Sequence, residues 1–321
     1  MNTKALDINQ PDVKRKVSAK RETVLTRIWE YKAFYLMLLP AVIYVLMFRY
    51  VPMFGVTLAF KDINLSEGLY GGTWAGFKHF EQLFKSTMFL NALRNTLIIS
   101  VLKLATNMAV PITIALFMNE ITKEWYRRTL QTAIYMPRFV SWVVYGGIVT
   151  LLLSPENGIV NGLIKVTGAE SIYFLSKPEY FKAIVILTDM LKEAGWGAVI
   201  YIAAISTVDI QQYEAAVIDG ASKLQRIWHI TLPGISNTII VMLVIKVGYL
   251  MSVGIDQIYN LYNPIVFETG DVLDTLVLRT GIQEGNISYG AAAGLFQATI
   301  GFILVVITNK LSKKFSESSL L

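Results

Sequence analysis

Long apolar stretches recur along this sequence, and they constrain its fold more than any other feature. Six of them are interpreted as spans, at about residues 33–56, 91–117, 131–153, 183–205, 234–256 and 287–309. Each is long enough to cross the hydrocarbon core of a bilayer, which needs about 20 residues of helix. Because backbone exposed to lipid must satisfy its own hydrogen bonds, helix is the expected state. The sequence therefore predicts an all-α membrane protein with six transmembrane helices.

Composition supports a membrane protein and argues against several other classes. Of the 321 residues, 54% are hydrophobic and 16% are charged, which is less charge than a soluble domain of this length carries. The absence of cysteine excludes disulfides and cysteine metal sites. Only two histidines, His79 and His229, are present, and they lie far apart in the sequence. Neither a metal site nor a membrane-embedded enzyme is therefore expected.

The distribution of lysine and arginine predicts the orientation of the spans. If the N-terminus is cytoplasmic, 16 of the 29 basic residues fall in cytoplasmic segments and seven fall in outer loops. Both termini are then cytoplasmic, and the protein is a multi-pass component of the cytoplasmic (inner) membrane. Residues 1–32 form a basic cytoplasmic arm that anionic membrane lipid would attract. Residues 33–310 form the membrane domain, and residues 311–321 form a tail. Because topology accounts for the net charge of +6, nucleic-acid binding is not expected.

A short aromatic segment precedes the second span. Phe77, Phe80 and Phe84 recur there at helical spacing. This pattern predicts a short helix that anchors the chain on the outer membrane surface, where aromatic side chains favour the interface; contact with a ligand is the alternative.

A charged segment, YEAAVIDGASKLQRIWHITLPGI at residues 213–235, separates the fourth and fifth spans. Two apolar faces at helical spacing lie on either side of its glycine, one with Ile210, Tyr213 and Val217, the other with Leu224, Ile227 and Trp228. Gly220 can end the first helix and turn the chain. Two short amphipathic helices joined by a bend favour a docking surface for a soluble partner. A helix pair that lies on the membrane surface is the alternative.

This segment resembles the EAA motif of ABC importer permeases, which is written as E-A-A, three residues, Gly, nine residues and I-x-L-P. The matching residues are Glu214, Ala215, Ala216, Gly220, Ile230, Leu232 and Pro233, and every spacing agrees. The resemblance implies coupling helices, at about residues 207–233, that sit in a cleft of an ATPase subunit and carry its motion to the spans.

Individual residues of the coupling segment have expected roles. Glu214 is the expected charged contact with the ATPase, and Asp219 is a second carboxylate that can pair with a basic residue of a partner. Gly220 is expected to form the bend. Ile230, Leu232 and Pro233 are expected to anchor the bend to the fifth span.

Other motifs resemble a branch of the sugar permeases that imports oligosaccharides and polysaccharide fragments. The matching residues are Asn95 and Thr96 at the second span, Pro137, Ser141 and Trp142 at the third, Asp271, Val272, Asp274 and Thr275 in a D-V-x-D-T element, and Ala292, Gly294, Leu295, Phe296 and Gln297 in the sixth span. The resemblance covers about residues 30–315. One departure is Leu191, which stands where this branch often has tryptophan before the lysine.

The resemblance implies a type I ABC importer transmembrane fold that works by alternating access. Its expected partners are a second similar permease, two ATPase subunits, an extracytoplasmic solute-binding protein and a glycan substrate. The sequence has no G-x-x-x-x-G-K-[ST] phosphate loop. We therefore expect ATP and Mg²⁺ on the partner ATPase, no cofactor on this chain, and no enzyme activity of its own.

Ionisable residues within spans mark candidate positions on the substrate path, because burying them is costly. Asp189 and Lys192 are spaced for an ion pair on one helix face, and Gly195 and Gly197 are expected to loosen that helix. Candidates for the path are Tyr145, Lys192, Glu193, Trp196, Tyr249 and Gln297, with Arg138 and Lys246 as further polar residues. A structural role is the competing interpretation for each. A basic Lys192 would suit a glycan that carries uronate.

Two other functions remain compatible with the sequence alone. One is an ABC permease for a solute other than a sugar, against which the D-V-x-D-T element and the sixth span argue. The other is a secondary transporter driven by an ion gradient, in which Asp189 and Glu193 would carry protons. A transporter of this kind usually has inverted repeats, and the six spans show no clear repeat.

Overall fold

A computed structural model describes residues 29, 31–63, 68 and 71–315 of the protein. Its internal contacts divide the chain into two units, residues 1–54 and residues 55–321. Most of the predicted basic arm and the end of the predicted tail lie outside the described residues. The described residues are mainly helical, with one antiparallel pair of short strands, β1 (Lys61–Asp62) and β2 (Thr73–Trp74).

The smaller unit contains most of the first predicted span. It holds α2 (Lys32–Val45), the π-helical η1 (Leu46–Tyr50) and the start of the 3-10 helix η2 (Val51–Phe60). Together these elements form an apolar helical run of 29 residues, Lys32–Phe60, which is long enough to cross a membrane.

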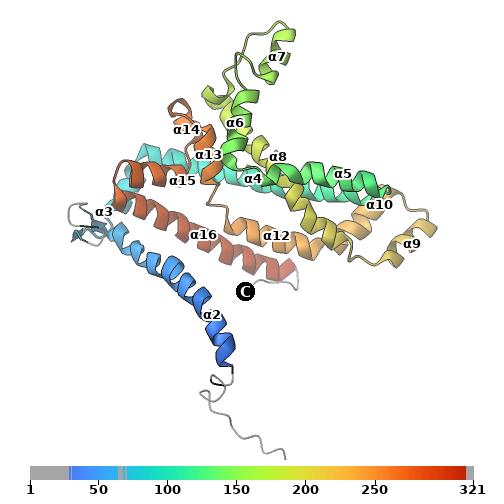
Figure 1. The fold of residues 1–321 in the computed structure, drawn as a ribbon, viewed down its shortest axis with the longest axis horizontal. Coiled ribbons are helices and arrows are strands. Elements are labelled where there is room, and N and C mark those ends of the chain that lie inside the picture. The colour runs from blue at the N-terminus through green and yellow to red at the C-terminus, as the bar shows by residue number, and fades with distance from the viewer. Residues whose placement is uncertain (1–28, 30, 64–67, 69–70, 316–321) are drawn as a thin grey trace, which may run out of the picture. The chain divides into compact units, whose positions relative to one another are not determined.

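The larger unit is assembled from helices of very different lengths (Figure 1). In chain order these are α3 (Lys78–Lys85), α4 (Thr87–Asn119), α5 (Glu124–Tyr135), η4 (Met136–Phe139), α6 (Trp142–Leu152), α7 (Ile159–Val166), η5 (Phe174–Ser176), α8 (Pro178–Ile205), α9 (Ile210–Ile218), α10 (Lys223–Arg226), η6 (Ile227–Thr231), α11 (Leu232–Gly234), α12 (Ser236–Gly248), α13 (Ile255–Leu261), η7 (Pro264–Val266), α14 (Phe267–Gly270), α15 (Leu273–Leu276), η8 (Val277–Gln283) and α16 (Ile287–Phe315).

Three long helices, α4, α8 and α16, form the frame of this unit. The 33 residues of α4 make a rod of about 50 Å at 1.5 Å per residue. It begins where the hydroxyl oxygen of Ser86 accepts a hydrogen bond from the backbone N–H of Phe89. Figure 1 shows α3 near this end of α4 and the short helices α9 and α10 near its other end. The frame therefore connects two distant groups of short helices.

By length and composition, three described helices can cross a membrane, and two more can if each of two bent pairs is one span. The three are Lys32–Phe60, Thr87–Asn119 and Ile287–Leu311. Helix α8 is long as well, but Asp189, Lys192 and Glu193 interrupt its apolar sequence.

The predicted third and fifth spans are not continuous helices. The third is broken between η4 and α6, whose helical segments meet at 103°, and the fifth joins the preceding short helices at 60°. Helix α12 also ends at Gly248, so the predicted fifth span stops before residue 256. Hydropathy did not reveal either break, because both lie within apolar sequence. The side chain of Lys192 donates hydrogen bonds to backbone carbonyls at the first of these breaks.

The predicted aromatic helix corresponds to α3. The ring of Phe80 packs on Phe60 at 5.4 Å between centroids, and the ring of Phe84 packs on Phe296 at 5.5 Å. Phe77 immediately precedes the helix and is 74% exposed. The ring of Phe77 also lies 5.5 Å from Phe60, so all three rings contact the protein, and Phe77, the most exposed of them, remains the candidate membrane anchor.

Close packing of α8 against α5 depends on Gly195. A Cβ atom at this position would lie 2.2 Å from the carbonyl oxygen of Ile134, which is too close for any side chain. Helix α8 runs without interruption past both Gly195 and Gly197. The prediction that these glycines loosen the helix is therefore wrong: Gly195 allows two helices to approach each other.

We expect Gly195→Ala to destabilise the larger unit by about 1–3 kcal/mol, because one added methyl group overpacks this contact. Thermal unfolding in detergent, followed by tryptophan fluorescence, measures the effect. Gly147→Ala on α6 is the matched control, since a Cβ atom there meets no atom within 4 Å. Equal unfolding temperatures for the two variants would show that the contact is not needed.

Candidate functional site

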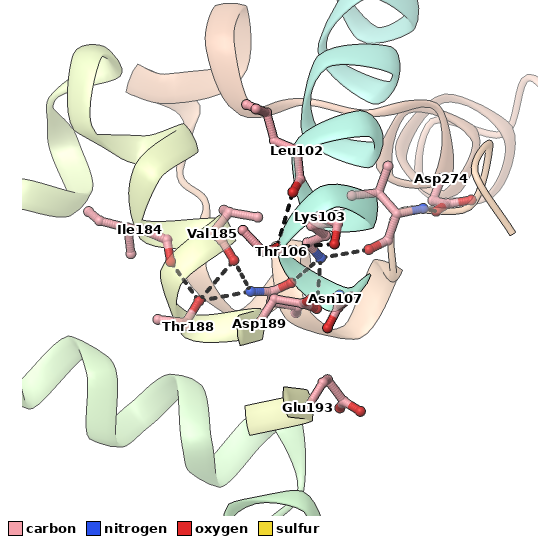
Figure 2. A network of polar contacts seen from close by, with 12 residues as sticks. Leu102, Lys103, Thr106, Asn107, Ile184, Val185, Thr188, Asp189, Glu193 and Asp274 are labelled. Atoms are coloured by element: carbon pink, nitrogen blue, oxygen red, sulfur yellow. Dashed lines mark hydrogen bonds and ion pairs between the residues drawn. The ribbon is translucent and has the colours of Figure 1, made fainter. Parts of the chain in front are cut away.

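A buried ion pair joins α4 to α8. The ammonium nitrogen of Lys103 lies 3.1 Å from Oδ1 of Asp189, and the two residues are 7% and 8% exposed. The side-chain amide of Asn107 donates a hydrogen bond to Oδ2 of Asp189 at 2.7 Å, so both carboxylate oxygens have partners. Figure 2 shows these groups facing one another between the two helices. The expected pair between Asp189 and Lys192 is replaced by this one.

The same lysine reaches the chain that follows α12. Lys103 Nζ donates to the backbone carbonyl of Val253 at 2.8 Å and to Oε1 of Gln257. The amide nitrogen of Gln257 in turn donates to the Val185 carbonyl at 2.7 Å and to the Thr188 hydroxyl at 2.8 Å. All three protons of the Lys103 ammonium group are therefore in use. We call Lys103, Asp189, Asn107 and Gln257 the central network.

Lys192 satisfies the broken end of η4. Its ammonium nitrogen donates to the backbone carbonyls of Pro137, Arg138 and Val140 at 3.0, 3.1 and 2.5 Å. The chain turns at the end of η4, where the Pro137 carbonyl also accepts a hydrogen bond from the backbone N–H of Val140 at 3.3 Å, and the negative end of a helix favours a cation. The side chain is 1% exposed. The structure thus gives Lys192 a structural role, and its donors are not free for a substrate.

The other predicted path residues separate into different places. The rings of Trp142 and Tyr145 lie 5.1 and 5.7 Å from the Lys192 ammonium nitrogen, so Tyr145 helps to enclose that charge. Glu193 pairs with Arg138 at 3.0 Å. Trp196 is 47% exposed and contacts Phe139 edge to face.

Asp274 of the D-V-x-D-T element connects the break after α12 to α16. Its Oδ2 accepts a hydrogen bond from the backbone N–H of Val253 at 2.9 Å, and its Oδ1 accepts one from the amide of Gln297 at 2.6 Å. Gln297 also donates to the carbonyl of Met251 at 2.8 Å. The element thus stabilises an irregular segment of backbone, and Gln297 belongs to that support.

A cavity of about 230 Å³ lies beside the central network, and we call it the central cavity. It is lined by Ser100, Lys103, Leu104 and Asn107 of α4, Asp189 of α8, Lys246 of α12, and Tyr249, Leu250, Ser252 and Val253 of the break. Of the six predicted path residues, Tyr249 is in this lining. Gln297 lines a neighbouring cavity between α12 and α16.

The segment between α8 and α12 folds into a defined pair of short helices. Helix α9 ends with the backbone N–H of Ala221 donating to the Ala216 carbonyl and that of Gly220 donating to the Val217 carbonyl. This is the Schellman arrangement, and it requires the positive φ of +77° that Gly220 adopts. The bend assigned to Gly220 is therefore observed.

Local hydrogen bonds hold the second short helix and tie it to the first. Ser222 and Gln225 form a reciprocal capping box at the start of α10. The hydroxyl groups of Tyr213 and Thr231 lie 2.9 Å apart and link α9 to η6. Leu232 packs on the buried cluster that includes Ile205. The residues 209–235 therefore form a braced segment, which we call the short-helix segment.

Several large apolar side chains of this segment are exposed. Ile218 is 86% exposed, and Leu224 and Trp228 are 69% and 67% exposed. Glu214 and Asp219 are exposed as well. Glu214 also lines a cavity of about 790 Å³ between α9 and the ends of α4 and α8. Exposed apolar side chains beside carboxylates suit contact with a protein surface.

Sequence reasoning missed most of the central network. Lys103, Asn107 and Gln257 were not among its candidates, although Lys103 is an ionisable residue within a predicted span. Applying the same rule to the second span that was applied to the fourth would have identified it. Asn107 and Gln257 carry no charge, and only the fold shows that they belong to the network.

Comparison with known proteins identifies the family of this chain. Residues 107–317 match the family of the binding-protein-dependent transport system inner membrane component. The chain belongs to this family. It is thus a membrane permease of a transport system that depends on a binding protein, and a transporter driven by an ion gradient is not supported.

Among the proteins similar to this chain are permeases and a solved transporter for polysaccharides. The permease is 42% identical to the polygalacturonan/rhamnogalacturonan transport system permease protein YteP of Bacillus subtilis (strain 168), with 94% of each chain covered. It is 40% identical to Protein LplB of the same organism, over 90% of this chain and 91% of that one. Its fold matches a chain of a bacterial ABC transporter involved in the import of the acidic polysaccharide alginate, with a TM-score of 0.86, 39% identity, and 92% and 100% coverage.

We expect Lys103→Met to destabilise the permease by about 3 kcal/mol or more, because it leaves the Asp189 carboxylate buried without its cation. The double variant Lys103→Met/Asp189→Leu should be less destabilised than Lys103→Met, since it removes both charges. Thermal unfolding of the purified protein measures both. Lys182→Met, at a partly buried lysine of α8, is the control. A double variant that is less stable than either single variant would contradict the role of the pair.

Proposed function

We propose that the permease is one of two similar membrane subunits of an ATP-driven importer for oligosaccharides or polysaccharide fragments, with acidic glycans as its substrates. Two ATPase subunits bind ATP and Mg²⁺, and an extracytoplasmic solute-binding protein delivers the glycan. The short-helix segment carries this proposal. It combines the spacing of the coupling motif with a braced backbone and an exposed apolar face.

The proposed topology has six spans with both ends of the chain in the cytoplasm. Helices α4, α8, α12 and α16, the run Lys32–Phe60 and the bent pair of α5 and α6 supply the spans. The excess of basic residues in the segments assigned to the cytoplasm supports this orientation. It puts the short-helix segment on the side where ATP is hydrolysed.

In the proposed mechanism, closure of the ATPase dimer moves the short-helix segment as one body. Glu214 has an exposed carboxylate for a basic residue of the ATPase, and Ile218 has an apolar surface for its cleft. The hydrogen bond between Tyr213 and Thr231 and the packing of Leu232 transmit the displacement to α12. The spans then change which side of the membrane the substrate path faces.

Two observations on similar proteins support acidic glycans as substrates. The named relative transports polygalacturonan and rhamnogalacturonan, and the solved transporter imports alginate. A second structure of the alginate transporter contains a periplasmic protein bound to an alginate pentasaccharide. That complex supports the proposed delivery by a solute-binding protein.

We expect the tagged permease, purified in mild detergent from its own membrane, to bring with it a second permease and a phosphate-loop ATPase. Mass spectrometry identifies the copurified chains, and phosphate release measures ATP hydrolysis. The isolated permease should not hydrolyse ATP, because its sequence has no phosphate loop. A permease that purifies alone, under conditions that preserve other complexes, would contradict the proposal.

We expect Glu214→Lys to reduce glycan uptake at least tenfold without loss of membrane insertion, because it reverses the charge presented to the ATPase. Uptake into proteoliposomes and copurification of the ATPase are the two measurements. Gln212→Lys is the matched control, since it adds a positive charge at another exposed position of α9. Normal uptake by Glu214→Lys would defeat the assignment.

A further inference from the structure

Lys103, Lys192 and Lys246 differ in whether their ammonium protons already take part in hydrogen bonds or ion pairs within the protein. Lys103 donates to Asp189, Val253 and Gln257, and Lys192 donates to three backbone carbonyls. An ammonium group has three protons, so both are saturated. Lys246 lines the central cavity, and no hydrogen bond or ion pair joins its ammonium group to any residue in the described part of the chain.

The acidic residues near Lys246 do not neutralise it by direct pairing. Asp189 and Glu193 are the carboxylates whose charges act on it. Asp189 is already paired with Lys103 at 3.1 Å, and Glu193 with Arg138 at 3.0 Å. The cavity therefore holds one cation in excess of these pairs, a charge that an anionic ligand would stabilise.

A second unsatisfied group lines the same cavity. Ser100 is 6% exposed, and its hydroxyl oxygen has no hydrogen-bond partner among the described residues. A buried hydroxyl without a partner costs free energy, and a ligand that bonds to it recovers that cost. The aromatic ring of Tyr249 completes the lining and is 71% exposed. Such a ring offers a flat apolar surface to the C–H groups of a sugar.

We propose that Lys246 and Ser100 bind the carboxylate of one acidic sugar residue in the central cavity, with the ring of Tyr249 against the face of that sugar. This inference rests on the proposed function, because it assumes that the permease transports acidic glycans. It assigns the recognition of the acid to Lys246 in place of Lys192. At about 230 Å³ the cavity is smaller than the usual site for a drug-sized molecule, so it accepts a single sugar unit and not a long chain.

The position of Lys246 connects recognition to the moving part of the permease. Lys246 lies in the last turn of α12, whose other end follows the short-helix segment. The break that begins at Tyr249 holds both the ring and the backbone carbonyl of Val253, to which Lys103 donates. A displacement of α12 therefore changes the distance between Lys246 and the α4 side of the cavity, where Ser100 lies.

Equilibrium binding to the purified importer complex in nanodiscs, without its solute-binding protein, tests the inference. The probes are trigalacturonate and its fully methyl-esterified form, which has the same sugars without negative charge. We expect Lys246→Met to weaken binding of trigalacturonate at least tenfold and binding of the ester less than twofold, because only the charged probe loses a charge-assisted hydrogen bond. Lys246→Arg should retain most of the affinity for trigalacturonate.

Lys182→Met is the matched control, because it removes a partly buried lysine that does not line the cavity. Unchanged trigalacturonate binding by Lys246→Met would overturn the inference, and so would an equal loss in Lys182→Met. Uptake of trigalacturonate into proteoliposomes, with the binding protein present, is measured in parallel. Uptake without measurable binding to the unaltered complex would overturn the role of Lys246 alone. The absence of both would overturn the acidic substrate as well.

Discussion

The buried ion pair between Lys103 and Asp189 determines how the centre of the larger unit is built. Its two residues come from different long helices, and its lysine also binds the irregular backbone that follows α12. In a low-dielectric interior neither charge is stable alone, so the pair and its hydrogen bonds must form together. The central cavity lies beside this pair and takes its polar lining from the same helices. The net charge of the cavity depends on which of the nearby cations are paired with a carboxylate of the protein: Lys103 is paired with Asp189, whereas Lys246 is not paired within the described residues.

Irregular backbone within predicted spans is a second feature of the larger unit. Two predicted spans are interrupted within the larger unit, the third before α6 and the fifth after α12, and a polar side chain satisfies backbone groups at each of these two positions. Lys192 donates to the carbonyls before α6, whereas Asp274 accepts the N–H of Val253 after α12. Exposed peptide groups are not tolerated in lipid, and broken helices persist only where protein groups satisfy them. Residues that resemble a substrate site in the sequence are, in these two cases, supports for the backbone.

Hydrophobicity and a spaced motif made much of the fold predictable. The long apolar runs identified α4 and α16, and the glycine spacing located the bend at Gly220. The breaks in the third and fifth spans were not predictable, because hydropathy measures transfer to lipid and not the path of the backbone. The partners of Asp189 were also not predictable, since Lys103 is far away in the sequence. Of the residues that line the central cavity, the sequence singled out Tyr249, Asp189 and Lys246, but not Ser100 or Asn107.

Helix α4 is long enough to connect the two membrane surfaces on which the proposed importer would act. It is a single uninterrupted rod from the cap at Ser86 to Asn119, where it lines a cavity with α9. Lys223 of α10 also pairs with Glu120, directly after the end of the rod. Pro111 lies inside this helix and removes one of its backbone hydrogen bonds, so it is the position at which the helix would bend. In the proposed orientation, one continuous helix therefore connects the nucleotide side to the opposite membrane surface, with Pro111 between them.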